Sequence, residues 1–186
     1  MSEPELVQRA RQGDQAAWER LVHLHQEPAF RLAYLLLGDA DEADDVAQET
    51  FIRAFRALDS FDTSRPLRPW LLRITTNLAY NQRRAVGRYL AAVRRIFAAE
   101  PQPAPHADAE HDHWEAQALW QAVRRLNRVD QEIIYLHYFL ELSVAETAQA
   151  LGVAPGTVKS RRHRALDRLR AIVDREFPVL REEHQA

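Results

Sequence analysis

The last long helical pattern of the chain carries the groups best suited to binding duplex DNA. Between Gly156 and Arg170 there are five arginines and Lys159 against one acid, Asp167. Guanidinium and ammonium groups bond phosphate oxygens and the guanine edge, and hydroxyl groups bond either. The alternative is a solvated basic helix on a structural bundle. The predicted DNA-binding residues of this segment are Thr157, Lys159, Ser160, Arg161, His163, Arg164 and Arg168.

A second basic segment is suited to unpaired bases. From Arg65 to Ala99 there are eight arginines and no acid. Guanidinium, amide and aromatic groups in a row fit phosphate contacts and base stacking. The proline-bounded loop Asp59–Pro69 precedes this row and can receive an unpaired base. The alternative is an ordinary solvated amphipathic face. The predicted residues are Arg65, Arg68, Trp70, Arg73, Asn77, Tyr80, Asn81 and Arg84.

An acidic segment precedes both. From Asp39 to Glu49 there are six acids and no base. Asp41, Asp45, Gln48 and Ile52 recur at helical spacing, with Glu49 beside them. An isoleucine among acids gains nothing in water, so this face favours docking on another protein. A lone exposed isoleucine on a solvated surface is the alternative.

Helices must position these groups. The patterns predict helices over 4–12, from an Asp14 cap up to Gly38, from an Asp41 cap to Leu58, and from Pro69 past Arg84. Four more are expected over 114–125, 130–140, 144–151 and 155–173. Residues 99–113 hold three prolines and four acids but no large apolar side chain, which is a linker composition. We therefore expect an all-α chain with two small helical domains, 1–85 and 114–175, a linker over 86–113 whose first part is helical, and a tail over 176–186.

The second domain ends in a predicted helix-turn-helix. Ser143 and Glu146 form a capping box at the start of a short helix. Gly152 supplies a turn that tolerates left-handed geometry, and Pro155 starts the next helix. The apolar stripe of that helix begins at Val158, opposite the basic face.

Composition excludes several classes of protein. The chain has 186 residues with 46% hydrophobic and 28% charged side chains, no cysteine, and a net charge of −2 that hides the separate charged segments. It has no run of about 18 apolar residues and no glycine-rich nucleotide loop, and we expect no cleavable leader, because residues 1–11 show no apolar core followed by a cleavage site. We expect a cytoplasmic protein without disulfide, cofactor, metal or catalytic residue.

Long stretches resemble the extracytoplasmic-function sigma factors of bacterial RNA polymerase. DDVAQETF over 44–51 and WLLRITTNLAYNQRR over 70–84 resemble region 2 of that family. The stretch LNRVDQEIIYLHYFLELSVAETAQALGVAPGTVKSRRHRALDRLR resembles region 4. The match covers roughly 5–85 and 115–172, in the family's order. Thr147 and Arg162 depart from it, because the family usually has aliphatic residues at both positions.

The resemblance implies roles for the three faces. The acidic face would dock on the clamp helices of the polymerase's largest subunit, and the second domain would meet the flap of the second-largest subunit. The loop 59–68 and the helix after it would capture the non-template strand of the minus-10 element, and the helix from Pro155 would read the minus-35 element. An anti-sigma protein is the expected regulator.

Two other classes of function stay open from the residues. One is a metal-dependent hydrolase built on linker groups that could bind a divalent ion, namely His106, Asp108, His111, Asp112 and His113. The other is a repressor or response regulator with a similar helix-turn-helix, which would bind duplex DNA without polymerase.

Overall fold

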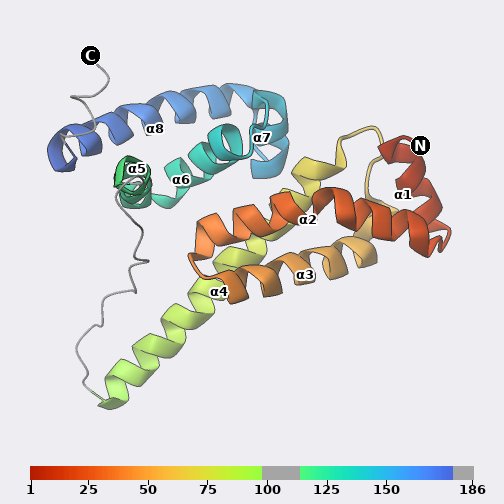
Figure 1. The fold of residues 1–186 in the computed structure, drawn as a ribbon, viewed down its shortest axis with the longest axis horizontal. Coiled ribbons are helices and arrows are strands. Elements are labelled where there is room, and N and C mark those ends of the chain that lie inside the picture. The colour runs from red at the N-terminus through yellow and green to blue at the C-terminus, as the bar shows by residue number, and fades with distance from the viewer. Residues whose placement is uncertain (98–113, 178–186) are drawn as a thin grey trace. The chain divides into compact units, whose positions relative to one another are not determined.

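The computed structural model describes residues 1–97 and 114–177, and every regular element there is helical (Figure 1). The all-α prediction is therefore confirmed. Two compact units are present. The first contains α1 to α4, and the second contains α5, α6, a π-helical turn and α8.

Capping residues set the boundaries of the first unit. Its elements are α1 (Glu3–Arg11), α2 (Gln15–Leu37), α3 (Ala40–Ala57), a 3₁₀ turn η1 (Leu58–Ser60) and α4 (Leu67–Phe97). Asp14 caps α2 by accepting from the backbone N–H of Ala17, as its side chain type predicts. Gly38 ends that helix with a φ of 83°, which a residue with a Cβ rarely adopts.

Two predicted helix starts need correction. Asp39, not Asp41, caps α3, because Asp39 is extended and its carboxylate accepts from Glu42 N–H. Asp41 lies in the first turn, where a negative charge also stabilises the helix. Helix α4 begins at Leu67, two residues before Pro69. Pro69 still lies in the first turn, where its missing N–H costs no hydrogen bond.

One apolar core joins α1, α2, α3 and α4. The contribution of α3 and the turn after it consists of Ala43, Ala47, Phe51, Ala54 and Leu58, which are all buried. Helix α1 adds three buried side chains, and the segment after α3 adds two more. The core therefore includes Leu6, Val7, Ala10, Phe61 and Leu67. Figure 1 shows the chain between α3 and α4 passing beside α1.

The second unit follows the predicted order of helices. Its elements are α5 (Trp114–Arg125), α6 (Arg128–Ile134), the π-helical turn η3 (Tyr135–Phe139) and α8 (Pro155–Glu176); along the chain, α7 (Val144–Leu151) lies between η3 and α8. The helix predicted over 130–140 thus changes to a wider turn at Tyr135, where Leu140 N–H donates to the carbonyl of Tyr135. Gly152 follows α7 with a φ of 66°, as the predicted turn requires.

The predicted linker is only partly described. Helix α4 continues to Phe97, so the first part of 86–113 is helical as expected. The linker histidines lie outside the described residues, and the metal-site alternative stays untested there. Across residues 1–97 and 114–177, no helix is long and apolar enough to cross a membrane, and no cluster of potential metal ligands occurs.

Candidate protein and nucleic-acid interfaces

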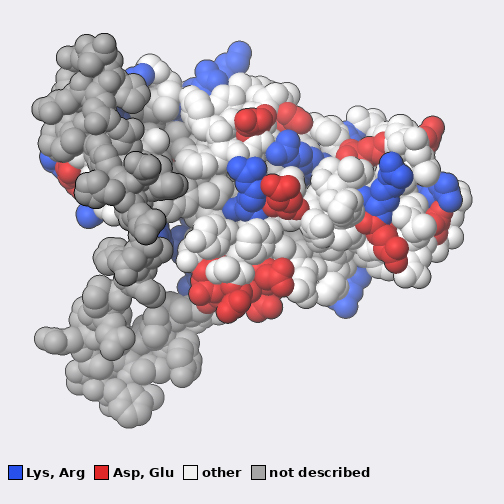
Figure 2. Space-filling model, viewed as in Figure 1, with Lys and Arg blue, Asp and Glu red and all other residues white. Residues whose placement is uncertain are grey.

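The acidic face of α3 is exposed as predicted. Asp41, Asp45 and Gln48 point outward, and the Ile52 side chain is 46% exposed beside them. Figure 2 shows acidic side chains gathered at the end of the bundle where α3 begins. Glu49 lies at the edge of this face, half-buried, and its carboxylate accepts from Arg53 Nε at 2.7 Å. An isoleucine side chain that faces water within an acidic surface stabilises a complex when a partner protein buries it.

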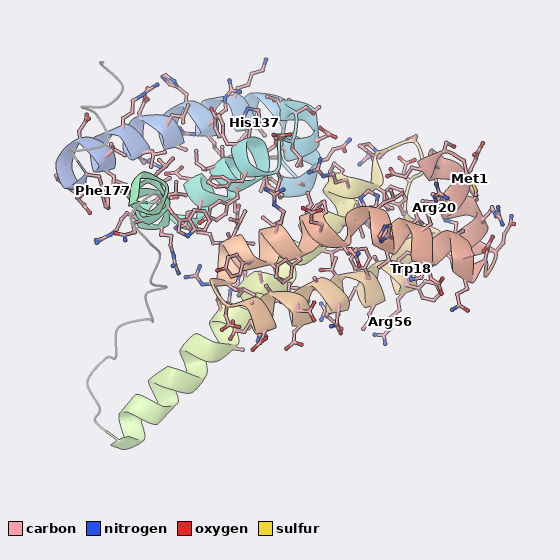
Figure 3. All side chains as sticks on the ribbon, viewed as in Figure 1. Met1, Trp18, Arg20, Arg56, His137 and Phe177 are labelled. Carbon is pink, nitrogen blue, oxygen red and sulfur yellow. The ribbon has the colours of Figure 1, made fainter. Side chains whose placement is uncertain are left out.

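An apolar groove adjoins this face and was missed in the sequence. It has a volume of about 560 Å³ between α2 and α3, and its apolar lining includes Val22, Phe30, Phe51 and Ile52. Farther along α3, Phe55 is 53% exposed and its ring lies 5.1 Å from that of Trp18, which Figure 3 labels. The spacing of Ile52 and Phe55 on one helix was the available signal.

The polar row of α4 forms one exposed face. Arg73, Asn77, Asn81 and Arg84 are all exposed, at intervals of four, four and three residues. Tyr80 does not belong to it, because its side chain is only 5% exposed. Tyr80 lies on the edge nearest Arg83, whose guanidinium donates to the carbonyl of Leu36 in α2. Little of the Tyr80 ring is therefore accessible, and its predicted base-stacking role stays a prediction.

The loop before α4 has buried ends and an exposed centre. Phe61 is buried, and its ring lies 4.8 Å from that of the partly buried Trp70. In the centre, Asp62 accepts from both the backbone N–H and the hydroxyl of Ser64, at 3.0 and 2.7 Å. These bonds, with the nearby Arg65 guanidinium, hold the pKa of Asp62 below its usual range. Arg65 is exposed and Arg68 is half-buried, so Arg65 is the more accessible cation.

Helix α8 presents most of its predicted contact groups. Lys159, Ser160, His163 and Arg164 are exposed, while Thr157 and Arg161 are partly buried. Val158 and Ala165 are fully buried on the opposite side, which fixes the outward face of the helix. The prediction of a one-sided basic helix starting at Pro155 is confirmed; contact with DNA stays a prediction.

Arg168 has a partner within the protein. Its guanidinium donates to the carboxylate of Asp130 in α6 at 2.5 Å, and the Asp130 side chain is only 4% exposed. Asn127, the cap of α6, donates a second bond to the same carboxylate oxygen at 2.7 Å. Arg168 therefore holds α6 against α8, and its predicted DNA contact stays untested.

Arg162, one of the two residues that depart from the family pattern, also has a hydrogen-bond partner within the second unit. Its guanidinium lies 2.9 Å from Nε2 of His137, and Nδ1 of that ring lies 2.7 Å from the carbonyl of Leu142. Figure 3 labels His137 in its helical segment. The carbonyl requires the proton on Nδ1, so Nε2 accepts from Arg162. These two hydrogen bonds connect α8 to the segment before α7. Thr147, the other residue that departs from the family pattern, is buried.

Two family models match the chain. Sigma-70 region 2 matches residues 21–89, and Sigma-70 region 4 matches residues 116–169. The first match contains the acidic face, the loop and the polar row of α4, and the second contains α8 up to Leu169. Helix α1 lies before both.

Curated relatives match along most of their length. The chain is 33% identical to the ECF RNA polymerase sigma factor SigW of Bacillus subtilis over 88% of this chain and 92% of the relative. It is 36% identical to the RNA polymerase sigma factor NccH of Alcaligenes xylosoxydans over 90% and 92%.

Two solved structures share the fold. CnrH in complex with the cytosolic domain of CnrY has a TM-score of 0.67 at 30% identity, covering 94% of this chain and 98% of that one. The sigma factor RpoE of Bartonella quintana, in complex with the anti-sigma factor NepR, has a TM-score of 0.65 at 28% identity, covering 85% and 97%.

Proposed function

Because the chain belongs to the extracytoplasmic-function sigma factors of bacterial RNA polymerase, which direct promoter-specific transcription initiation, we propose that its three polar faces divide that function between them. The observation that carries the proposal is that one helical bundle exposes two chemically distinct faces. Helix α3 presents acids around Ile52, and α4 presents Arg73, Asn77, Asn81 and Arg84. A single binding partner does not need both the acidic face and the polar row, so the two faces serve different partners.

The acidic face is the polymerase-docking surface. Asp41, Asp45, Gln48, Glu49 and Ile52 meet the clamp helices of the largest subunit, and burial of Ile52 adds an apolar contact to the charged ones. The groove between α2 and α3 extends the same surface. The second unit meets the flap of the second-largest subunit.

The loop and α4 capture the opened strand of the minus-10 element. Arg65, Arg68, Trp70, Arg73, Asn77, Asn81 and Arg84 supply phosphate contacts and amide groups around the exposed loop centre. Strand separation then rests on binding bases that have flipped out of the duplex, and polymerase itself performs nucleotidyl transfer. No catalytic role is proposed for this chain.

Helix α8 reads the minus-35 element in the major groove. The contact groups are Thr157, Lys159, Ser160, Arg161, His163 and Arg164. Arg162 supports this helix indirectly, through its hydrogen bond to His137. Two similar structures hold partner proteins, one of them named an anti-sigma factor. An anti-sigma protein is accordingly the regulator we propose for this chain.

A charge reversal on α3 tests the docking surface. We expect Asp45→Arg to lose affinity for bacterial core RNA polymerase by at least tenfold, measured as fluorescence anisotropy of the labelled full chain. The control is Glu19→Arg, at an exposed position of α2 outside that groove. Core affinity of Asp45→Arg equal to that of the unmodified chain would contradict the docking face.

A second charge reversal tests promoter reading. The unmodified chain with core polymerase should transcribe a duplex promoter selected from a randomised library, and the chain alone should bind that duplex poorly. Lys159→Glu should lose about 5- to 150-fold in minus-35 discrimination, the range of one good base contact. It should keep transcription from a template with a preformed bubble. Arg170→Glu, near the other end of α8, is the control. Specific duplex binding without polymerase would instead favour a repressor.

A further inference from the structure

We propose that α1 is a positioning element for the minus-10 loop: Arg11 and Glu3 fasten the two ends of the loop and so set its base preference. This inference rests on the proposed function of the loop. Neither residue falls within the matched region 2, which begins at residue 21. Both make contacts across more than 40 residues of sequence.

Arg11 fastens the start of the loop. Its Nε and Nη2 atoms donate to the carbonyl of Leu58 at 3.0 and 2.9 Å, and Nη2 also donates to the carbonyl of Phe61. Leu58 opens the η1 turn, and Phe61 follows it. One planar guanidinium therefore bonds two backbone carbonyls at the start of the loop, and that of Leu58 also accepts from Phe61 N–H at 3.1 Å.

Glu3 fastens the end of the loop. One carboxylate oxygen accepts from the backbone N–H of Leu67 at 3.0 Å, at the first residue of α4. The other oxygen lies 2.9 Å from Nε2 of His25 in α2, whose side chain is 9% exposed. The carboxylate caps α4 from a distant helix and is itself oriented by a nearly buried imidazole.

Apolar packing holds both anchors in place. Leu6, Val7 and Ala10 of α1 are buried in the same core as Phe61 and Leu67. The side chains between the fastened ends remain on the outside, where Asp62 and Ser64 bond to each other. Because its ends are fixed and its centre is exposed, the loop presents one preformed shape to an unpaired base, and less ordering is required on binding.

Arg9 provides a matched control within α1. It lies one half-turn from Arg11 and pairs with Asp14 at 2.5 Å, and its side chain is 54% exposed. Its guanidinium donates hydrogen bonds to Asp14 and Met1 rather than to the loop backbone. Arg9→Gln therefore removes a guanidinium from the same helix without releasing the loop.

The test has two readouts on the full chain. Native-state hydrogen exchange of the amides at Phe61, Ser64 and Arg65 should speed up about tenfold in Arg11→Gln and in Glu3→Gln, the size of one lost hydrogen bond. Arg11→Lys should recover part of the protection. With core polymerase and a promoter library randomised over the minus-10 element, Arg11→Gln should flatten the preference at one base and leave minus-35 preference and core affinity unchanged.

The outcomes of these experiments distinguish a failure of the positioning role of α1 from a failure of the proposed function on which it rests. If the unmodified chain with core polymerase selects no minus-10 sequence, the proposed function fails and the positioning role fails with it. If it does select one, but Arg11→Gln keeps the same exchange rates and base preference, only the role of α1 is overturned. An equal loss over all library promoters, with the preference intact, would mean that Arg11 supports the fold alone and would also overturn the inference.

Discussion

At the scale of single residues, the buried carboxylate of Asp130 distinguishes Arg168 from the other arginines of α8. Arg161, Arg164 and Arg168 have the same chemistry and lie on one helix, but only Arg168 is opposite an acid that is 4% exposed. A carboxylate buried to that degree requires a partner, because water cannot solvate it. An exposed phosphate competes poorly for a guanidinium that already compensates a buried charge.

Removing the arginine should cost more than removing the acid. Arg168→Ala leaves Asp130 buried with only the Asn127 amide, and we expect the α6–α8 contact to lose about 3 kcal/mol. Asp130→Asn leaves Arg168, which is 53% exposed, free to be solvated by water, so its cost should be smaller. Native-state hydrogen exchange of α6 and α8 amides measures both. Arg170→Ala, whose partner Asp167 is exposed, should change little. Equal costs for Arg168→Ala and Asp130→Asn would contradict this account.

At the scale of elements, α1 is attached to the bundle partly through one ionised group. The contact with His25, and then the N–H of Leu67, hold the pKa of Glu3 below its ordinary value of 4.5, although burial opposes them. The folded state therefore favours the carboxylate. The stability that Glu3 contributes is fully present above pH 4.5 and is lost as the pH falls through the lower pKa of the folded state.

Acid should therefore erase the difference between the chain and a Glu3→Gln variant. At pH 7 we expect the variant to be less stable by about 1.5 kcal/mol, as for a hydrogen bond to a charged group. As the pH falls from 6 to about 3, the two free energies of unfolding should converge. Urea unfolding followed through the amide NMR signals of α1 to α4 gives both values. A difference that stays constant over this range would show that Glu3 does not act through its charge.

Local signals predicted the elements well. Asp14, Gly38 and Pro155 act through their immediate neighbours in sequence, and each lies at the helix boundary that its type predicts. Asp39 and Asp41 are both competent caps, so composition alone could not decide between them. The exposed row on α4 was predicted correctly except that Tyr80, which was included in it, is buried. Periodicity gives the direction of a helix face but not how far neighbouring helices cover its edge.

Long-range contacts could not be predicted in the same way. Arg11 reaches Leu58 across 47 residues, and Arg168 reaches Asp130 across 38. Nothing in a single sequence distinguishes an arginine that binds a distant carbonyl from one that binds solvent. The groove between α2 and α3 needed two helices to be placed side by side. These features therefore emerged only with the fold.

At the scale of the whole molecule, the proposed function requires two units of a single chain to bind two elements of one promoter. Each unit alone offers a few basic groups and should bind DNA weakly and with strong salt dependence. Once one unit is bound, the other is held nearby at a high effective concentration, so covalent connection raises the joint affinity without any new contact.

Cutting the chain between the units should therefore abolish most promoter use. A specific protease site introduced between residues 99 and 113 allows the full chain to be assembled with core polymerase before or after cleavage. With both fragments present at equal concentration, we expect promoter affinity to fall by about 100-fold or more when cleavage precedes assembly. The uncleaved variant is the control. Added salt should increase the difference in promoter affinity between the intact and the cleaved chain, because each fragment relies on its own phosphate contacts. If the cleaved pair bound the promoter as tightly as the intact chain, polymerase alone would be sufficient to hold the two units together, and connection through the chain would contribute nothing to promoter recognition.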